Sequence, residues 1–284
     1  MREAQDGREG FAIDGLQAVV ASPHPTQLSN LATRSFVRSG DDVMIAGLII
    51  TGSGTKRVLL RALGPTLARS AAPVGDVLPD PVLELHSPNG TTTTNESWRE
   101  GANAELIPED LQPRDATEAA LLVSLAPGAY TAIVRGAGGG TGNALIDAFD
   151  LDANPTASLS NVATRSFVQR GDKVMIAGFT LEGTTTKDVF IRALGPSIAQ
   201  PPTSVPNVLA DPLLTLFNAN GDAINTNDNW QDTQGSRIQA TGLAPSAPQD
   251  PAMIVTLSAG AYTAIVSGVS DGTGNATVEV YALQ

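Results

Sequence analysis

The chain has 284 residues, a formal net charge of −12 and no cysteine. The lack of cysteine excludes disulfides, Cys-based zinc sites and thiol catalysis. The acidic balance argues against nucleic-acid binding, which depends on Lys and Arg, and no apolar run is long enough to predict a membrane span. Because 42% of the residues are hydrophobic but only 4% aromatic, we expect a core of Val, Ile, Leu and Ala.

The chain contains two copies of one unit. Val58-Leu-Leu-Arg-Ala-Leu-Gly-Pro65 returns as Val189-Phe-Ile-Arg-Ala-Leu-Gly-Pro196, an offset of 131 residues (189 − 58). An internal repeat of this kind sets the architecture. We therefore divide the chain into a leader (1–27), copy 1 (28–152), a linker (153–158) and copy 2 (159–284).

The leader has polar residues at 1–10 and a predicted strand at 11–20. Its opening residues lack the apolar region of a signal peptide. The predicted strand precedes a Pro-containing connector and Leu28-Ser-Asn30, and the end of copy 1 has the same layout before Leu159-Ser-Asn161. Residues 11–20 therefore resemble the last strand of a preceding unit. They form either an extra edge strand on copy 1 or an orphan strand that pairs with another chain.

Within each copy, short β-type runs alternate with turn residues. In copy 1 the predicted strands cover 42–50, 57–63, 81–86, 91–94, 121–125, 130–134 and 144–149, whereas 66–79 and 99–118 are less regular. Asn89-Gly90 and Asn220-Gly221 stand at predicted hairpin turns, which favour positive φ. Many short strands with regular turns predict an all-β fold of two tandem antiparallel β-sandwiches, jelly-roll-like in character.

Several of these blocks are similar to a known family. Asp211-Pro-Leu-Leu-Thr-Leu-Phe217, Asn227-Asp-Asn229 and Leu257-Ser-Ala-Gly-Ala-Tyr262 resemble the bacterial pre-peptidase C-terminal domain family. The resemblance covers the later two-thirds of each copy, and it implies a jelly-roll sandwich, export and an accessory role beside secreted hydrolases. The Ala-Thr-Arg-Ser-Phe and Arg-Ala-Leu-Gly-Pro blocks depart from that family. They are more similar to an uncharacterised repeat of large secreted proteins from environmental bacteria.

Two arginines stand inside apolar strands at matched positions. A half-buried Arg requires a carboxylate or carbonyl partner. Asp80 and Asp211 are also matched between the copies. We therefore predict the structural ion pairs Arg61–Asp80 and Arg192–Asp211.

Trp98 and Trp230 are matched, and each follows an Asn-containing turn. An exposed Trp could stack on a sugar ring while Asn229 and Asp232 bind its hydroxyls. The alternative is a Trp that packs on the sandwich and buries a large apolar area. The sequence favours the packed Trp and keeps the glycan site as the second interpretation.

The loops of copy 2 are rich in Asn and Asp. Oxygen ligands of this kind suit Ca²⁺, and the candidate ligands are Asn218, Asn220, Asp222 and Asp228. No Glu closes the loop as in an EF-hand. The competing interpretation is Asx-turn chemistry at hairpin ends, which uses the same residue types. Calcium is the only cofactor that the sequence suggests.

Catalysis has little support in the sequence. His24 and His86 have no counterparts in copy 2, and no Gly-x-Ser-x-Gly motif accompanies them. The pairs Asp228 with Asp232 and Glu96 with Glu100 could supply the two carboxylates of a glycoside hydrolase, but spacing alone does not select them.

The sequence thus favours a non-catalytic structural or adhesive module of a secreted or cell-surface protein. It would associate with itself by strand addition through residues 11–20. A carbohydrate-binding module is the second hypothesis and a polysaccharide-directed hydrolase the third.

Overall fold

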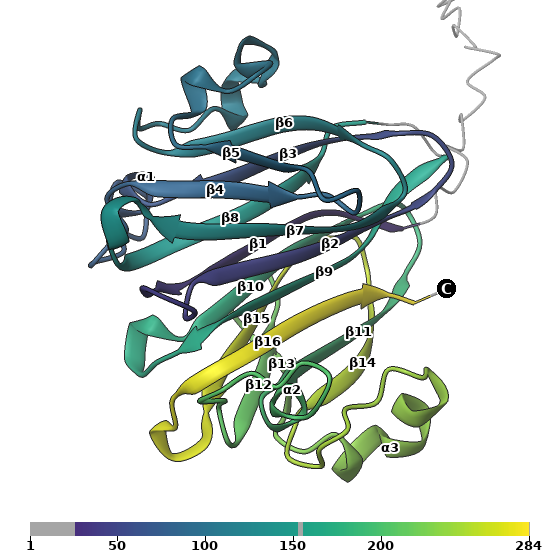
Figure 1. The fold of residues 1–284 in the computed structure, drawn as a ribbon. Coiled ribbons are helices and arrows are strands. Elements are labelled where there is room, and N and C mark those ends of the chain that lie inside the picture. Colours follow the sequence, from purple (N-terminus) through teal and green to yellow (C-terminus); the bar gives the residue numbers. More distant parts are fainter. Residues whose placement is uncertain (1–25, 153–155, 284) are drawn as a thin grey trace, which may run out of the picture.

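The computed structural model describes residues 26–152 and 156–283, and these fold mainly into β-strands (Figure 1). The strands form two eight-stranded sheets in which every neighbouring pair is antiparallel. The expected all-β antiparallel sandwich is therefore confirmed. The predicted strand at 11–20 lies outside the described residues.

The two copies contain the same strands in the same order. Those of copy 1 are β1 (Gln27–Val37), β2 (Met44–Gly52), β3 (Lys56–Leu63), β4 (Pro81–His86), β5 (Thr92–Asn95), β6 (Ala119–Leu125), β7 (Gly128–Gly136) and β8 (Gly142–Asp150). Those of copy 2 are β9 (Ala157–Val168), β10 (Met175–Glu182), β11 (Lys187–Leu194), β12 (Pro212–Phe217), β13 (Ala223–Asn227), β14 (Ala252–Leu257), β15 (Gly260–Gly268) and β16 (Gly274–Ala282). Strand β9 begins at Ala157, so the predicted linker of 153–158 extends too far.

Helical elements are short. The α-helices are α1 (Pro65–Ala68), α2 (Pro196–Ala199) and α3 (Gln231–Ala240), and the 3-10 helices are η1 (Trp98–Glu100), η2 (Ala104–Leu106), η3 (Glu109–Leu111), η4 (Ala137–Gly139), η5 (Gly171–Lys173) and η6 (Val269–Asp271). Gly90 and Gly221, at the two Asn-Gly turns, have φ values of 83° and 85°. The expectation of positive φ at these turns is confirmed.

Each copy contributes four strands to each sheet. In copy 1 the half-sheets are β1-β8-β3-β6 and β2-β7-β4-β5, and copy 2 repeats this order as β9-β16-β11-β14 and β10-β15-β12-β13. The half-sheets then join edge to edge. Strand β1 pairs with β10 over Gln27–Arg34, and β2 pairs with β9 over Ile45–Gly52. Figure 1 shows copy 1 above copy 2, with β1, β2, β9 and β10 in the middle.

The joined sheets enclose one continuous apolar core. Along β2 the buried residues are Met44, Ala46, Leu48 and Ile50, which is the alternation of a strand with one face inward. One cluster of buried residues runs from Leu28 and Leu60 in copy 1 to Phe179 and Val278 in copy 2. The two sandwiches therefore share a core and form one body.

A second apolar layer covers the outer face of one sheet in each copy. In copy 1 the segment 96–118, with η1 to η3, packs Trp98 and Ile107 against Leu59 and Leu122. In copy 2 the corresponding cover contains α3, which packs Trp230 and Ile238 against Phe190 and Ile254. The sequence did not predict α3.

The covering segments also complete the strand edges beneath them. The Gln234 side-chain amide donates to the Ile254 carbonyl oxygen at 3.0 Å and accepts from the Ile254 N–H at 2.7 Å. In copy 1 the Asn103 amide donates to the Leu122 carbonyl oxygen at 3.3 Å. Strands β14 and β6 are the outermost strands of their sheets. Side chains therefore satisfy backbone groups that would otherwise be left at these edges.

Candidate functional site

Arg61 and Arg192 bind carboxylates on the neighbouring strand. Arg61 donates from Nε to Asp147 Oδ1 at 2.9 Å and from Nη2 to Asp147 Oδ2 at 2.6 Å. Arg192 donates from Nε to Glu279 Oε2 at 2.8 Å, and Tyr281 donates its hydroxyl to the same oxygen at 2.6 Å. The predicted partners Asp80 and Asp211 are wrong.

The sheet register explains this correction. Arg61 stands directly opposite Asp147 in the β3–β8 ladder, and Arg192 stands opposite Glu279 in the β11–β16 ladder. Cross-strand neighbours on one face have their Cβ atoms about 5 Å apart. Asp80 and Asp211 instead precede β4 and β12, where their carbonyl oxygens accept from the N–H groups of Ala137 and Val269.

Each arginine also anchors its covering segment. Arg61 Nη1 donates to the Leu111 carbonyl oxygen at 2.6 Å, and Arg192 Nη1 donates to the carbonyl oxygen of Leu243. Burial raises the pKa of Asp147, against the opposing effect of the Arg61 guanidinium. Burial, followed by the Glu279 carboxylate, raises the pKa of Tyr281 to about 12. The hydrogen bonds from Arg61 and Arg192 to the carbonyl oxygens of Leu111 and Leu243 hold the covering segments on the sheets.

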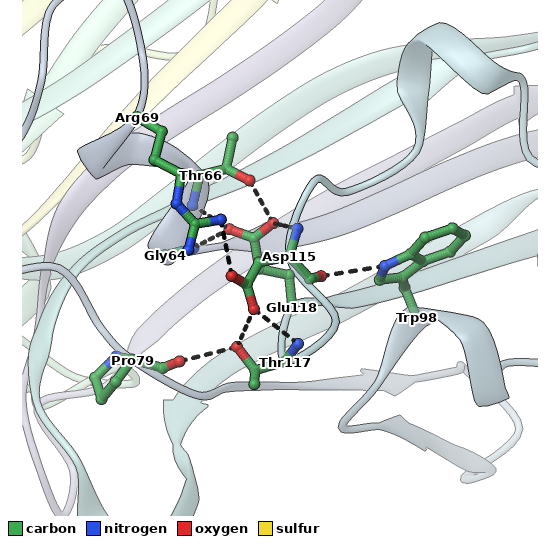
Figure 2. Close-up of polar contacts among 8 residues, drawn as sticks. All are labelled: Gly64, Thr66, Arg69, Pro79, Trp98, Asp115, Thr117 and Glu118. Carbon is green, nitrogen blue, oxygen red and sulfur yellow. Dashed lines mark hydrogen bonds and ion pairs between the residues drawn. The ribbon is translucent and has the colours of Figure 1, made fainter.

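A buried carboxylate holds the Arg-Ala-Leu-Gly-Pro turn of copy 1 (Figure 2). Glu118 is fully buried, and its Oε1 accepts from the N–H groups of Gly64 at 2.9 Å and Thr66 at 2.7 Å. Its Oε2 accepts from the Thr66 hydroxyl at 2.5 Å and from the Asp115 N–H at 3.3 Å. Gly64 is required here because a Cβ would lie 1.9 Å from the Leu78 carbonyl oxygen. The repeated motif is therefore a structural turn.

Asp250 performs the same task in copy 2. It is fully buried and accepts from the N–H groups of Gly195 at 2.7 Å and Ser197 at 3.0 Å. Burial raises the pKa of Asp250, although hydrogen bonds from Ser197 and Gly195 oppose the shift. A Cβ on Gly195 would lie 2.0 Å from the Leu209 carbonyl oxygen. Both copies thus use a buried acid to fix the same turn.

Both tryptophans belong to the cores beneath the covering segments. Trp98 is 7% exposed and Trp230 is 6% exposed. Their indole N–H groups donate to the carbonyl oxygens of Asp115 at 3.1 Å and Ala247 at 3.2 Å. Both rings are largely buried, as the packed interpretation expects.

Figure 2 also shows how the loop beside Trp98 is fixed. The Asp115 carboxylate accepts from the Thr117 N–H at 3.1 Å and the Thr117 hydroxyl at 2.9 Å, and it forms an ion pair with Arg69 at 3.0 Å. The hydrogen bonds from Thr117 lower the pKa of Asp115. These contacts position the carbonyl group that binds the indole.

The candidate calcium ligands form hairpin-turn contacts. Asn218 Oδ1 accepts from the N–H groups of Asn220 at 2.9 Å and Asp222 at 3.0 Å, and its amide donates to Asp222 Oδ2 at 3.0 Å. This is the Asx-turn chemistry of the competing interpretation. Asp228 lies after β13 on the exposed surface. Within residues 26–152 and 156–283, no group of three or more His, Asp or Glu is placed to hold a metal ion.

The remaining candidates are surface residues. Asp228, Asp232, Glu96 and Glu100 are exposed, and Asn229 donates to Asp232 Oδ2 at 3.3 Å. His86 forms a hydrogen bond with the Thr92 hydroxyl at 3.0 Å and lies 3.4 Å from Glu84 Oε2. His24 lies outside the described residues. None of these contacts brings two of the carboxylates together around one position where a substrate could bind.

A cavity that the sequence did not indicate lies where the copies meet. It has a volume of about 300 Å³ and separates the loop 72–76 of copy 1 from η5 of copy 2. Its polar lining comes from Arg34, Asp76, Asn143, Asp172 and Lys173. The Lys173 ammonium forms an ion pair with Asp76 at 2.8 Å and lies 4.4 Å from the centre of the Phe36 ring.

The signal for this cavity was present in the sequence. Arg34 belongs to the Ala-Thr-Arg-Ser-Phe block, which returns in copy 2 with Arg165. The sequence could not show that the end of β1 faces η5, because this contact follows from edge-to-edge pairing of the copies. Arg34 stands opposite Ile176 of β10 in that pairing.

Comparison with known proteins gives little further information. No protein-family model matches the chain, and no curated protein matches it. Among solved structures, the chain is similar to a DUF4785 family protein from Legionella pneumophila, with 11% identity and a TM-score of 0.26. The match covers 88% of this chain and 61% of the other, so the chain spans about three-fifths of that protein. Likeness at this level carries no functional argument.

The helices in the described part of the chain are too short and polar to cross a membrane.

Proposed function

We propose that this protein is a non-catalytic structural or adhesive module of a secreted or cell-surface protein. The observation that most supports this proposal is the double junction, in which β1 pairs with β10 and β2 pairs with β9. Two separate sandwiches on a linker would flex, whereas two sheets that continue through both copies resist bending and extension. The buried carboxylates support this role because each one holds a turn or a covering segment.

Mechanical unfolding tests the structural role. When the chain is stretched between its ends, the shared core predicts one unfolding step that releases residues 26–283 together. Two steps of about half that length would show that the copies are independent, and the proposal of one rigid module would fail. A flexible pair of unrelated domains of similar length is the appropriate reference.

The adhesive part of the proposal is self-association by strand addition. Strands β5 and β13 are the outermost strands at the opposite ends of the two sheets, and Thr92, Thr93 and Thr94 on β5 are exposed. An extended segment such as residues 11–20 could pair with an edge of this kind. Light scattering on the full chain and on a chain lacking residues 1–22 tests it. Oligomers of the full chain alone support strand addition, and a monomeric mass for each of the two chains refutes it.

A further inference from the structure

The two Asn-Gly turns share a backbone conformation. Asn89-Gly90 joins β4 to β5 and Asn220-Gly221 joins β12 to β13, and all four residues are exposed. In each turn the glycine N–H donates to the carbonyl oxygen three residues earlier, which is that of Ser87 at 3.0 Å and of Asn218 at 3.1 Å. Any difference in chemistry between the turns must therefore come from their side chains.

The side-chain oxygen of Asn89 binds a backbone N–H of its own turn. Asn89 Oδ1 accepts from the Thr91 N–H at 3.0 Å, which forms an Asx turn. In copy 2 the corresponding N–H belongs to Asp222, and it donates to Asn218 Oδ1 at 3.0 Å. Asn218 stands where copy 1 has Ser87. In copy 2 another side chain therefore binds the N–H group that Asn89 binds in copy 1.

An asparagine that precedes a glycine can undergo ring closure. The glycine nitrogen bonds to Cγ of the asparagine and loses its proton to water, and the Cγ–Nδ2 bond breaks so that ammonia leaves with a proton from water. Water then opens the cyclic imide to aspartate or isoaspartate. The net reaction converts an amide and water into an acid and ammonia, and it needs no oxidant or reductant. Glycine favours the reaction because no Cβ shields its nitrogen.

The Thr91 N–H can stabilise the transition state of this ring closure. Negative charge develops on Asn89 Oδ1 as Gly90 attacks, and a hydrogen bond to an anionic oxygen is roughly twice as strong as one to a neutral oxygen. An interaction that strengthens in the transition state accelerates the reaction. We propose that Asn89 is a site of self-catalysed deamidation and that it reacts faster than Asn220. The inference does not depend on the proposed structural role.

Deamidation at this site changes the open end of one sheet. Asn89 lies three residues before β5, which is the outermost strand of its sheet. The product adds a negative charge next to the start of β5, and charged side chains at a sheet edge oppose pairing with another strand. The modification therefore acts on the edge of copy 1 before it acts on the edge of copy 2.

Incubation of the full chain at mildly alkaline pH, followed by peptide mapping with mass spectrometry, measures the acid formed at each asparagine over time. In the folded chain we expect Asn89 to react about five times faster than Asn220, which is the factor that one hydrogen bond contributes. In urea the Asx turn is lost, and the two rates should become similar. The ratio in urea also corrects for the different residues that follow Gly90 and Gly221.

Exchange of the first residue between the two turns tests the mechanism. Ser87→Asn supplies a second acceptor for the Thr91 N–H and should slow Asn89 to the rate of Asn220. Asn218→Ser removes the acceptor that competes with Asn220 and should raise the rate at Asn220. Each change introduces the residue that the matched turn already contains, so folding should be preserved. Equal rates at the two asparagines of the folded chain, no acid at Asn89, or an unchanged rate in Ser87→Asn would overturn the proposal.

Discussion

Thr33 and Thr164 occupy the same position in the two copies, and their hydroxyl oxygens lie 2.9 Å apart in the centre of the molecule. They are 0% and 1% exposed. Equivalent residues meet in this way only when the copies are related by an approximate twofold axis that passes between them. The same axis explains the two junctions. The first strand of copy 1 (β1) pairs with the second strand of copy 2 (β10), and the second strand of copy 1 (β2) pairs with the first strand of copy 2 (β9).

The first prediction concerns this central hydrogen bond. Thr33→Val or Thr164→Val alone leaves one buried hydroxyl without its partner and should lower the free energy of unfolding by about 1–3 kcal/mol. The double variant replaces both hydroxyls with methyl groups and should recover most of that loss. Urea denaturation of all four chains measures it. Additive losses in the double variant would show that the contact between the hydroxyls is unimportant.

The second prediction concerns the dependence of each copy on the other. Residues 26–152 alone would expose the edges of β1 and β2 and the side of the core that includes Leu31 and Leu48. Exposed edges and apolar surface favour pairing with another chain. We expect this fragment to form dimers in which β1 of one copy pairs with β2 of the other. Light scattering measures the mass, and a stable monomer would contradict the prediction.

The third prediction concerns the Arg-Ala-Leu-Gly-Pro turn. Gly64→Ala would place a Cβ 1.9 Å from the Leu78 carbonyl oxygen, so the turn must move away from Glu118. We expect a loss of about 3 kcal/mol in the free energy of unfolding. Gly75→Ala is the control, because its Cβ would have no atom within 4 Å. Similar losses in thermal or urea unfolding for both variants would contradict this role of Gly64.

These positions show how much of the structure could be predicted from the sequence. The alternation of apolar and polar residues, together with the turn residues, predicted the sandwich. Both patterns depend only on residues that are close in the sequence. The partner of Arg61 could not be found in this way, since Asp147 is 86 residues away and only the β3–β8 register brings them together. The junction cavity could not be predicted from the sequence either, because Arg34 and Lys173 line the same cavity only after the two copies pair.

The missed helix α3 has a similar cause. Its residues Gln231–Ala240 are largely polar, and Ile238 is its only buried residue. Trp230 and Ile238 pack against Ile254 of β14 and Gln234 hydrogen-bonds to it, although the backbone leaves helical geometry at Gln234 (φ −124°, ψ 20°). Gln234 contacts β14 through hydrogen bonds rather than apolar packing. The apolar residues of this segment are therefore too few to predict a helix by their periodicity.

The fourth prediction tests the corrected ion pair. Arg61→Ala would leave the Asp147 carboxylate, which is 2% exposed, without its cation, and should cost about 3–5 kcal/mol. Asp80→Asn should change the free energy of unfolding by less than about 0.5 kcal/mol, because Asp80 contributes through its backbone. Replacing both partners, as in Arg61→Met with Asp147→Leu, should restore much of the loss. A large effect of Asp80→Asn in chemical denaturation would favour the original pairing.

The fifth prediction concerns pH and Asp250. Burial raises the pKa of Asp250 above its ordinary value of 3.8, so the folded protein holds this proton more tightly than the unfolded chain does. The stabilisation from proton binding is complete below pH 3.8 and is lost as the pH rises through the higher pKa of the folded state. Asp250→Asn cannot titrate, and this contribution to the pH dependence should vanish.

The comparison is made by measuring the free energy of unfolding at several pH values from about 3 to 7. Asp250→Asn removes this titration, so its free energy of unfolding should vary less with pH than that of the parent chain. The difference between the two chains should be largest at low pH and should shrink as the pH rises above 3.8. A difference that grows with rising pH would mean that the folded protein lowers the pKa of Asp250, with its hydrogen bonds outweighing burial.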